Sequence, residues 1–434
     1  MVLARASQSV ITFADAIQVK RLGYKAIAAT ATGGLNVLGF VVLAWGTVFI
    51  VQSFVAQLSG SGGRDETPRF AWYGLVIAAI AAVIAAALIP LVGPALALTD
   101  YSVEVRDQMA SYMAIRMLSI GAIVGIEALG NWYGGLGNTW MQLIAGVITM
   151  VAAVVLNWIL IDGHLGAPAM GVNGAALAST IASFLGFGFL AVAFWRRWGG
   201  APTARATGLS LRELGRVLRF GLPNGINWFL EFAAFQLFVN VVLASLGDET
   251  VAAINVVIAV NSLSFMPAFG LASAGAILAG QAIGRDARDA VWPQVKTTLV
   301  CTMTWMGVVG LVYAVFPAQV LSLFASERSG QLVAIGSTML VISTAWQLSD
   351  AIGMTLGETL RAAGDTTWPA AARIILAWAI FAPSAYVTVR YLHGGPIGAM
   401  LCLVVYVGLL GAAISWRFRS GAWKRIQLIE PKLV

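Results

Sequence analysis

The sequence predicts an all-α polytopic membrane protein with about twelve transmembrane helices in two pseudo-symmetric six-helix lobes. Hydrophobic residues make up 59% of the 434 residues and charged residues only 10%, a composition that would give a soluble domain an untenable surface. The apolar runs are long and unbroken, whereas a membrane β-barrel needs short strands of alternating polarity. The two halves of the chain also repeat each other, which gives the two lobes.

Each predicted span is an apolar run of about 20 residues, the length that crosses the hydrocarbon core as a helix. Twelve runs meet this requirement. In chain order they cover residues 3–20, 34–57, 70–97, 112–134, 141–162, 172–195, 217–246, 251–280, 294–323, 331–360, 367–389 and 396–416.

The first run is short for a span, because Asp15 stands only fourteen residues from Met1 and Arg5 interrupts what remains. Either the true start lies upstream, or this chain carries half of its first helix. We expect an upstream in-frame start that supplies the missing apolar residues, since a spanning helix must satisfy its backbone inside the membrane.

Basic residues set the orientation of the spans, because cytoplasmic loops carry an excess of Lys and Arg. With the long loop after the sixth span placed in the cytoplasm, 18 basic residues lie inside, Arg373 among them, and 7 lie outside. The cluster from Lys20 to Lys25 is the one local exception. On this assignment the spans themselves contain almost no arginine.

The only long polar linker, residues 198–216, divides the chain nearly in half. The halves repeat: Gly23 matches Gly247 at a shift of 224 residues, and Gly137 matches Gly364 at a shift of 227. Parallel repeats of this kind build many transporters. We therefore predict an N-terminal lobe over 1–197, a cytoplasmic linker over 198–216, a C-terminal lobe over 217–418 and a cytoplasmic tail over 419–434.

One acid, Glu231, stands near the middle of the apolar stretch from Gly221 to Gly247. An acid there costs about 2.5–3.5 kcal/mol on insertion scales, so it normally faces a bundle interior or a wet cavity. Asn224 and Asn227 precede it by seven and four residues, so all three share one helix face. We expect this polar stripe to help hold an ion or a proton. The alternative is a buried acid that only holds helices together.

A second acid, Asp350, lies in the tenth span with Trp346 four residues earlier and Ser343 seven earlier. One helix face therefore carries an indole, a hydroxyl and a carboxylate, which suits an organic cation or a small metal cation. Trp346 could equally pack against lipid or the core. Two carboxylates that share a low-dielectric site cannot both ionise cheaply, so one must hold a proton or the pair must hold a cation.

Three further acids lie in predicted spans. Asp15 belongs to the N-terminal lobe, where Glu127 can join it, and Glu358 is expected to snorkel or cap at the cytoplasmic end of its span. The two cysteines and two histidines form no metal-ligand pattern. Because the sequence has no Gly-rich phosphate loop and no Ser/His/Asp set, we expect neither an ATP-driven pump nor an enzyme.

Six segments carry a family likeness: FADAIQVKRLGYKAIAA (13–29), GLGNTWM (135–141), MGVNGAALAS (170–179), GLPNGINWFLE (221–231), FMPAFGLASAGAILAGQAIGRD (265–286) and DAIGMTLGETLRAAGDTTWP (350–369). Together and in this order they resemble the MATE family of multidrug and toxin extrusion transporters over nearly the whole chain. The likeness is closest to the NorM type.

The resemblance implies twelve helices in two six-helix lobes that export cationic, amphipathic compounds against Na⁺ or H⁺. Glu231 and Asp350 match the C-lobe acids of the NorM type that are implicated in cation binding. Asp15 matches the first-helix aspartate that other members use for coupling. Trp346 stands where NorM-type proteins often have a tyrosine, and Asp162 comes one residue later than the Asn-x-x-x-Asp pattern of one branch.

We accordingly predict a monomeric antiporter of the bacterial inner membrane that works by alternating access, without a cofactor and without a nucleic-acid partner. Na⁺ at Glu231 and Asp350 is favoured over H⁺, because sodium prefers several hard oxygen ligands. The alternative function is a flippase for lipid-linked oligosaccharides, whose cavity usually carries several basic residues. The predicted coupling residues are Glu231, Asp350 and Asp15, and the predicted cavity residues are Asn227, Trp346, Glu127, Asn224 and Ser343.

Overall fold

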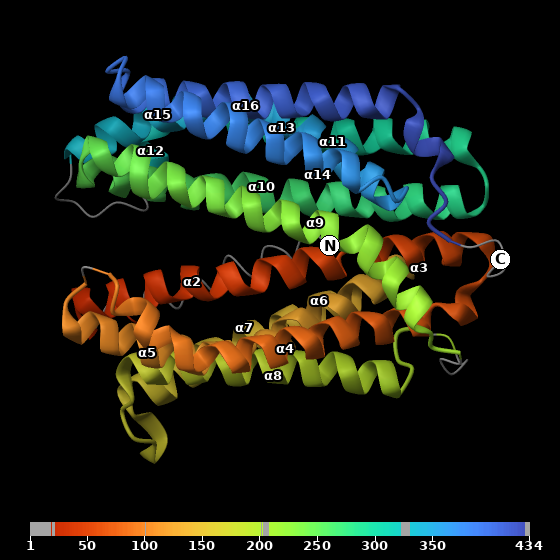
Figure 1. Ribbon diagram of the computed structural model, residues 1–434, viewed down its shortest axis with the longest axis horizontal. Helices are drawn as coiled ribbons and strands as arrows, with labels where there is room; N and C mark the ends of the chain where they lie inside the picture. Colours follow the sequence, from red (N-terminus) through yellow and green to blue (C-terminus); the bar gives the residue numbers. More distant parts are fainter. Residues whose placement is uncertain are drawn as a thin grey trace. The chain divides into compact units, whose positions relative to one another are not determined.

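The computed structural model describes residues 19, 22–99, 101–200, 202, 208–322 and 330–429. Every regular element in these ranges is a helix, as the composition predicts, and the helices form two units (Figure 1). The N-terminal unit covers Leu3–Gly225 and the C-terminal unit covers Ile226–Glu430, so the boundary falls inside one helix, α9 (Leu211–Leu237). The predicted division into two lobes, a linker and a tail stays a prediction.

The N-terminal unit contains seven α-helices before α9 in the residues that the structure describes. They are α2 (Tyr24–Val48), α3 (Ile50–Ser61), α4 (Pro68–Leu96), α5 (Val103–Met117), α6 (Ile120–Gly135), α7 (Trp140–Asp162) and α8 (Gly171–Trp195), with the short 3₁₀ helices η2 (Arg64–Glu66) and η3 (His164–Gly166).

The C-terminal unit continues from α9 into a π-helical segment, η4 (Phe238–Leu243). The elements after it are η5 (Ala244–Leu246), α10 (Asp248–Gly284), η6 (Arg288–Ala290), α11 (Val291–Val315), α12 (Pro317–Ser322), α13 (Gly330–Ala362), α14 (Thr367–Ile375), the π-helical η7 (Leu376–Phe381), α15 (Ala382–Arg390), α16 (Gly395–Arg419) and η8 (Ala422–Arg425).

Ten helical runs of the described chain are long and apolar enough to cross a membrane, and α5 with α6, bent by 42°, makes an eleventh. These eleven overlap the second to twelfth predicted spans, which confirms the polytopic helical fold. The first predicted span, 3–20, lies outside the described residues apart from Val19. Asp15 and the expected truncation lie there as well.

The predicted ninth span, 294–323, is too long at its end. The helix α11 stops at Val315, and a separate short helix, α12, begins at Pro317. Phe316 between them leaves the helical region of backbone space, with φ −125° and ψ 44°. Proline has no N–H to donate and a fixed φ, so it starts a helix more readily than it continues one.

The internal repeat is visible in the backbone. Gly23 precedes α2 with φ 95° and ψ 172°, and Gly247, 224 residues later, precedes α10 with φ 105° and ψ 160°. Gly137 and Gly364, which are 227 residues apart, have φ of 86° and 88°. Residues with a side chain rarely adopt this conformation. The repeated glycines therefore mark turns that the two units share.

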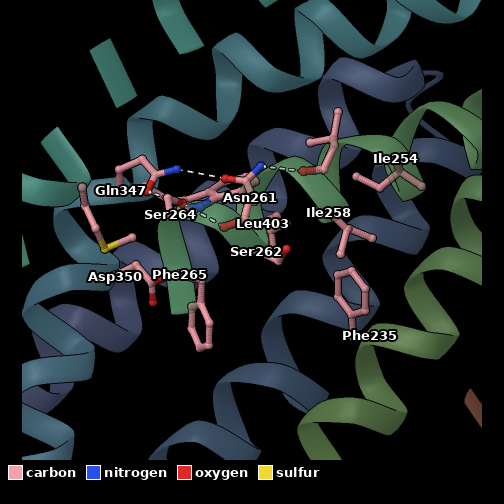
Figure 2. Close-up of a pocket in the computed structure, with 13 residues that line it drawn as sticks. Phe235, Ile254, Ile258, Asn261, Ser262, Ser264, Phe265, Gln347, Asp350 and Leu403 are labelled. Carbon is pink, nitrogen blue, oxygen red and sulfur yellow. Dashed lines mark hydrogen bonds between the residues drawn. The ribbon is translucent and has the colours of Figure 1, made fainter. Parts of the chain in front are cut away.

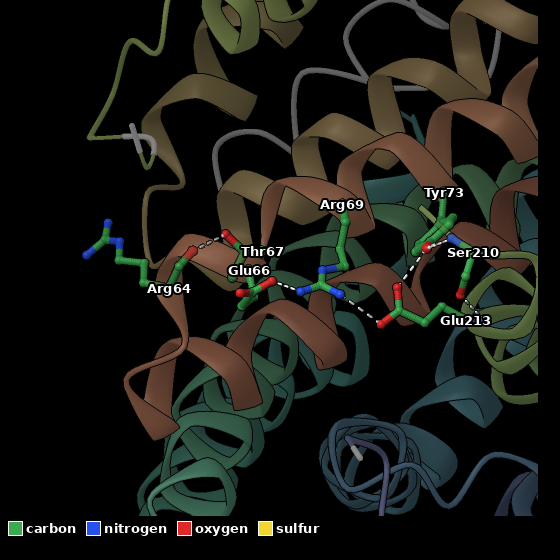
Figure 3. Close-up of polar contacts among 7 residues, drawn as sticks. All are labelled: Arg64, Glu66, Thr67, Arg69, Tyr73, Ser210 and Glu213. Atoms are coloured by element: carbon green, nitrogen blue, oxygen red, sulfur yellow. Dashed lines mark hydrogen bonds and ion pairs between the residues drawn. The ribbon is translucent and has the colours of Figure 1, made fainter. Parts of the chain in front are cut away.

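A polar cluster fixes the first turn of α9 within the N-terminal unit (Figure 3). Glu213 accepts hydrogen bonds from Arg69 Nη1 at 3.1 Å and from the Tyr73 hydroxyl at 2.7 Å. The Tyr73 oxygen in turn accepts the backbone N–H of Ser210 at 2.9 Å, and Arg69 also pairs with Glu66. These contacts attach the segment before α9 to the start of α4, so we call them the α4–α9 anchor.

Candidate cation site in the C-terminal unit

Glu231 lies in α9 with both carboxylate oxygens engaged. Arg373 Nη1 donates to Oε2 at 3.0 Å, and the Tyr406 hydroxyl donates to Oε1 at 3.0 Å. Arg373 comes from α14 and Tyr406 from α16, so the carboxylate joins three helices that are far apart in the sequence. The side chains of Glu231 and Arg373 remain 34% and 23% exposed. The pair is therefore held firmly but is not sealed inside the protein.

The sequence counts Arg373 among the cytoplasmic basic residues, and the structure gives it a partner that this count does not consider. The residue lies inside the run Thr367–Arg390, which is long and apolar enough to span a membrane, and its guanidinium pairs with Glu231. A charged residue inside a span normally has a partner within the helix bundle. The position of Arg373 within the predicted span 367–389 could therefore have predicted an acidic partner.

Asp350 lies on α13, near this pair. The charges of both Arg373 and Glu231 act on it, so the structure brings the two predicted coupling acids of the C-terminal unit into one electrostatic environment. Asp350 and Trp346 both line a pocket of about 260 Å³, and Figure 2 labels Asp350 within it. The other pocket residues come from α9, α10, α11, α13 and α16: Phe235, Ile254, Val257, Ile258, Asn261, Ser262, Ser264, Phe265, Met306, Gln347 and Leu403.

The pocket combines aromatic faces with one carboxylate. Phe235, Phe265 and Trp346 line it together with Asp350, and Phe265 stacks on Phe269 with ring centroids 6.0 Å apart. Aromatic faces attract cations through their quadrupole, and a carboxylate adds direct charge attraction. The composition of this pocket fits a compact organic cation.

A hydrogen-bonded network that sequence reasoning missed crosses from α10 to α13 along one wall of the pocket (Figure 2). Gln347 Nε2 donates to Asn261 Oδ1 at 2.9 Å, and the Ser264 hydroxyl donates to Gln347 Oε1 at 3.4 Å. Asn261 Nδ2 donates to the Ser343 hydroxyl, which donates onward to the Leu340 carbonyl. Ser343 is thus part of this network, and Asn261 could have been found as an amide inside an apolar run.

The two asparagines before Glu231 have different surroundings. Asn224 donates its Nδ2–H to the carbonyl of Gly46 in α2 at 2.7 Å, within the N-terminal unit. Asn227 is 5% exposed, and its Oδ1 accepts no hydrogen bond from the described residues. An unpartnered buried carbonyl is costly unless something donates to it or coordinates it. Asn227 therefore offers an oxygen for a cation one helical turn from Glu231.

Of the predicted site residues in the N-terminal unit, Glu127 is in α6 and 2% exposed. It accepts a hydrogen bond from Asn131 Nδ2 at 3.4 Å. Asp15 lies outside the described residues. Among the residues that are described, no group of three or more His, Cys, Asp or Glu side chains forms a metal site, so Na⁺ at Glu231 and Asp350 stays a prediction.

With this geometry in place, comparison with known proteins identifies the family. The model of the MatE family matches residues 1–159 and 226–387, well over half of the chain. The chain belongs to the MATE family. The second matched segment contains Glu231, Asp350 and Arg373, so three of the four charged and hydroxyl groups of the site lie in family sequence.

Two curated relatives have names that state a role. A probable multidrug resistance protein NorM from Thermotoga maritima is 26% identical over 372 residues, covering 86% of this chain and 80% of the relative. The multidrug resistance protein PmpM of Pseudomonas aeruginosa is 27% identical over 433 residues, covering 95% and 87%.

The MATE fold is shared as well. A solved structure of MATE in the straight conformation superposes with a TM-score of 0.88 at 21% identity, covering 98% of this chain and 95% of the other. This agreement supports the fold that the sequence predicts.

Proposed function

We propose that this MATE-family chain exports cationic, amphipathic compounds in exchange for a univalent cation. The observation that carries the proposal is the pair of acids, Glu231 and Asp350, held in a helical membrane unit beside an aromatic pocket. The names of the NorM and PmpM relatives support multidrug efflux. We expect the protein to work as a monomer, by alternating access, in the inner membrane of a bacterium.

Na⁺ is our proposed coupling ion, with H⁺ as the alternative. Sodium needs several hard oxygens, and the structure offers the two carboxylates and the unpartnered Asn227 Oδ1. Of the further oxygens that the sequence suggests, the Ser343 hydroxyl donates to the Leu340 carbonyl, and Asn224 donates through its amide nitrogen to Gly46 of the N-terminal unit. Asn227 Oδ1 accepts no hydrogen bond from the part of the chain that the structure describes, so it is the neutral oxygen that we propose as a ligand.

Arg373 does not support the alternative function as a flippase for lipid-linked oligosaccharides. A lipid-linked pyrophosphate would need a guanidinium that is available to it, whereas this one already pairs with Glu231. With one guanidinium and two carboxylates, the ionised site carries a net negative charge. A site of that sign attracts cations.

The test is ethidium efflux from proteoliposomes that contain the purified protein. Asp350→Asn should abolish ion-driven efflux, because the variant removes one of the two charges that hold the cation. Glu249→Gln is the matched control, since Glu249 is an exposed acid in the first turn of α10. Wild-type rates in Asp350→Asn, or no efflux by the wild type under any ion gradient, would refute the proposal.

A further inference from the structure

The candidate site contains three charged side chains, and their charges do not cancel. Glu231 and Asp350 are acids, whereas Arg373 pairs with the first at 3.0 Å and acts electrostatically on the second. Tyr406 is the fourth polar group and is a neutral hydroxyl donor. With both acids ionised, the group carries a net charge of −1, so a single positive charge neutralises it.

The guanidinium holds the position that an arriving cation would need. It covers Glu231 Oε2, and Tyr406 covers Oε1. A cation bound at Glu231 must therefore share the carboxylate with Arg373 or replace it. Since the paired side chains are 34% and 23% exposed, a cation can reach them without unfolding of the unit.

The backbone next to both partners has an uncommon form. The π-helical η4 begins seven residues after Glu231, and the π-helical η7 begins three residues after Arg373. The two segments contact each other through Phe238 and Phe381, with ring centroids 5.0 Å apart, and Phe381 stacks on Tyr406 at 5.2 Å. Single π-helical turns are rare and are found frequently at functional sites.

A proline follows the π-helical segment η7. Pro383 lies in the first turn of α15, directly after η7, and it cannot donate a backbone hydrogen bond to the preceding turn. Trp378 of η7 donates to the carbonyl of Leu230 at 3.1 Å, beside Glu231. The segment that follows Arg373 is thus attached to α9 by side chains, while its own backbone ladder is locally irregular.

We propose that Arg373 is a resident counterion that limits the site to one added positive charge. An arriving univalent cation takes the place of the guanidinium on Glu231, and Arg373 shifts its pairing towards Asp350. Release of the cation restores the Arg373–Glu231 pair. This inference rests on the proposed cation transport, and it adds a rule for which cations are accepted: one net charge and not two.

The rule is tested by changing the net charge of the site in single steps. Glu231→Gln raises it to 0, Arg373→Met lowers it to −2, and Arg373→Lys keeps it at −1. The double variant Glu231→Gln with Arg373→Met also returns it to −1. The probes are tetraphenylphosphonium, with one permanent charge, and a bis-quaternary ammonium compound, with two. Equilibrium dialysis of the purified protein measures both dissociation constants.

The ratio of the two affinities should follow the net charge. We expect Arg373→Met to shift the ratio towards the divalent probe by about tenfold, because one unit charge acts across several ångströms of low-dielectric protein. Arg373→Lys and the double variant should keep the wild-type ratio, and Glu231→Gln should bind both probes more weakly. Recovery in the double variant separates a charge effect from loss of a structural contact.

Equal ratios in Arg373→Met and Arg373→Lys would overturn the counterion role while leaving cation transport intact. If Arg373→Met fails to fold, the double variant and Glu231→Gln still decide the question, since the inference requires them to differ. A wild-type protein that binds neither probe would instead overturn the proposed function, and this inference with it.

Discussion

The two units are copies in their scaffold and differ in their chemistry. Adding 227 to residues 103 and 135, the bounds of α5 and α6, gives 330 and 362, the bounds of α13. Adding 224 to residues 171 and 195 of α8 gives 395 and 419, the bounds of α16. At these four ends the repeat holds residue for residue.

The polar groups of the candidate site are not part of that repeat. Subtracting 227 from Asp350 and Arg373 leads to Ile123 and Gly146, and subtracting 224 from Tyr406 leads to Ala182. The backbone differs at the same places. The α5–α6 span is bent by 42°, whereas α13 is one continuous helix, and the regular α7 corresponds to α14, η7 and α15 with their π-helical turn. The two units therefore share a helical framework, and the charges of the candidate site belong to the C-terminal unit alone among the positions compared.

The largest expected effect compares one acid from each unit. Glu231→Gln should abolish ion-driven efflux, because it removes the carboxylate that Arg373 and Tyr406 hold in place. Glu127→Gln should lower the rate less than about fivefold, since a glutamine oxygen can still accept the Asn131 hydrogen bond. Ethidium efflux from proteoliposomes with equal protein content measures both. Equal losses would place essential charge in both units.

The next prediction asks which unit carries the coupling ion. A sodium gradient at equal pH on both sides should drive efflux, and Asn227→Ala should raise the sodium concentration for half-maximal efflux by about fivefold, because it removes one neutral oxygen ligand. The Asn224→Ala variant is the control, since Asn224 bonds to Gly46. Efflux that ignores sodium but follows a pH step would favour protons and make Asp15 of the N-terminal unit the next residue to change.

A smaller effect is expected in the aromatic pocket. Trp346→Ala should raise the KM for tetraphenylphosphonium transport by about tenfold with little change in maximal rate, because cation–π contacts contribute from about 0.5 kcal/mol at exposed sites to about 2 kcal/mol when desolvated. Trp195→Ala is the control, since Trp195 lies at the end of α8 and is 83% exposed. An unchanged KM in Trp346→Ala would assign this indole to packing and move substrate recognition elsewhere.

Much of the fold could be read from the sequence, because span length and hydropathy depend on single runs of residues. The acids Glu231 and Asp350 could be singled out for the same reason, since each is unusual within its own span. Their partners could not be, because pairing depends on which helices meet. Arg373 lies 142 residues from Glu231 along the chain, and the rule that assigns basic residues to loops placed it outside the membrane.

The network around Asn261 also shows that the sequence does not reveal which residues face each other. The sequence assigns Ser343 to the cavity because it shares a helix face with Asp350. Trp346 and Asp350 line one pocket, whereas Ser343 is not among the residues that line it. Helical periodicity does not show what faces the residue. Asn261 of α10 donates to Ser343 and accepts from Gln347, so the hydroxyl and both amides bind one another.

The smallest effect concerns the α4–α9 anchor, the polar cluster of the N-terminal unit that has no part in the candidate site. Glu213 and Arg69 are 17% and 11% exposed, and exposed or partly exposed ion pairs contribute about 0–1 kcal/mol. Glu213→Gln should therefore lower the melting temperature of the detergent-purified protein slightly, with the loss near the upper end because Tyr73 also donates to this carboxylate. Efflux rates should stay close to the wild type, since the variant leaves the charges of Glu231, Asp350 and Arg373 unchanged. Size-exclusion chromatography after a series of heating steps measures the melting temperature, with Glu249→Gln as the exposed-acid control.

A Glu213→Gln protein that melts like the wild type but transports as poorly as Glu231→Gln would show that the anchor takes part in the transport cycle. The division between a structural N-terminal cluster and a functional C-terminal one would then have to be abandoned.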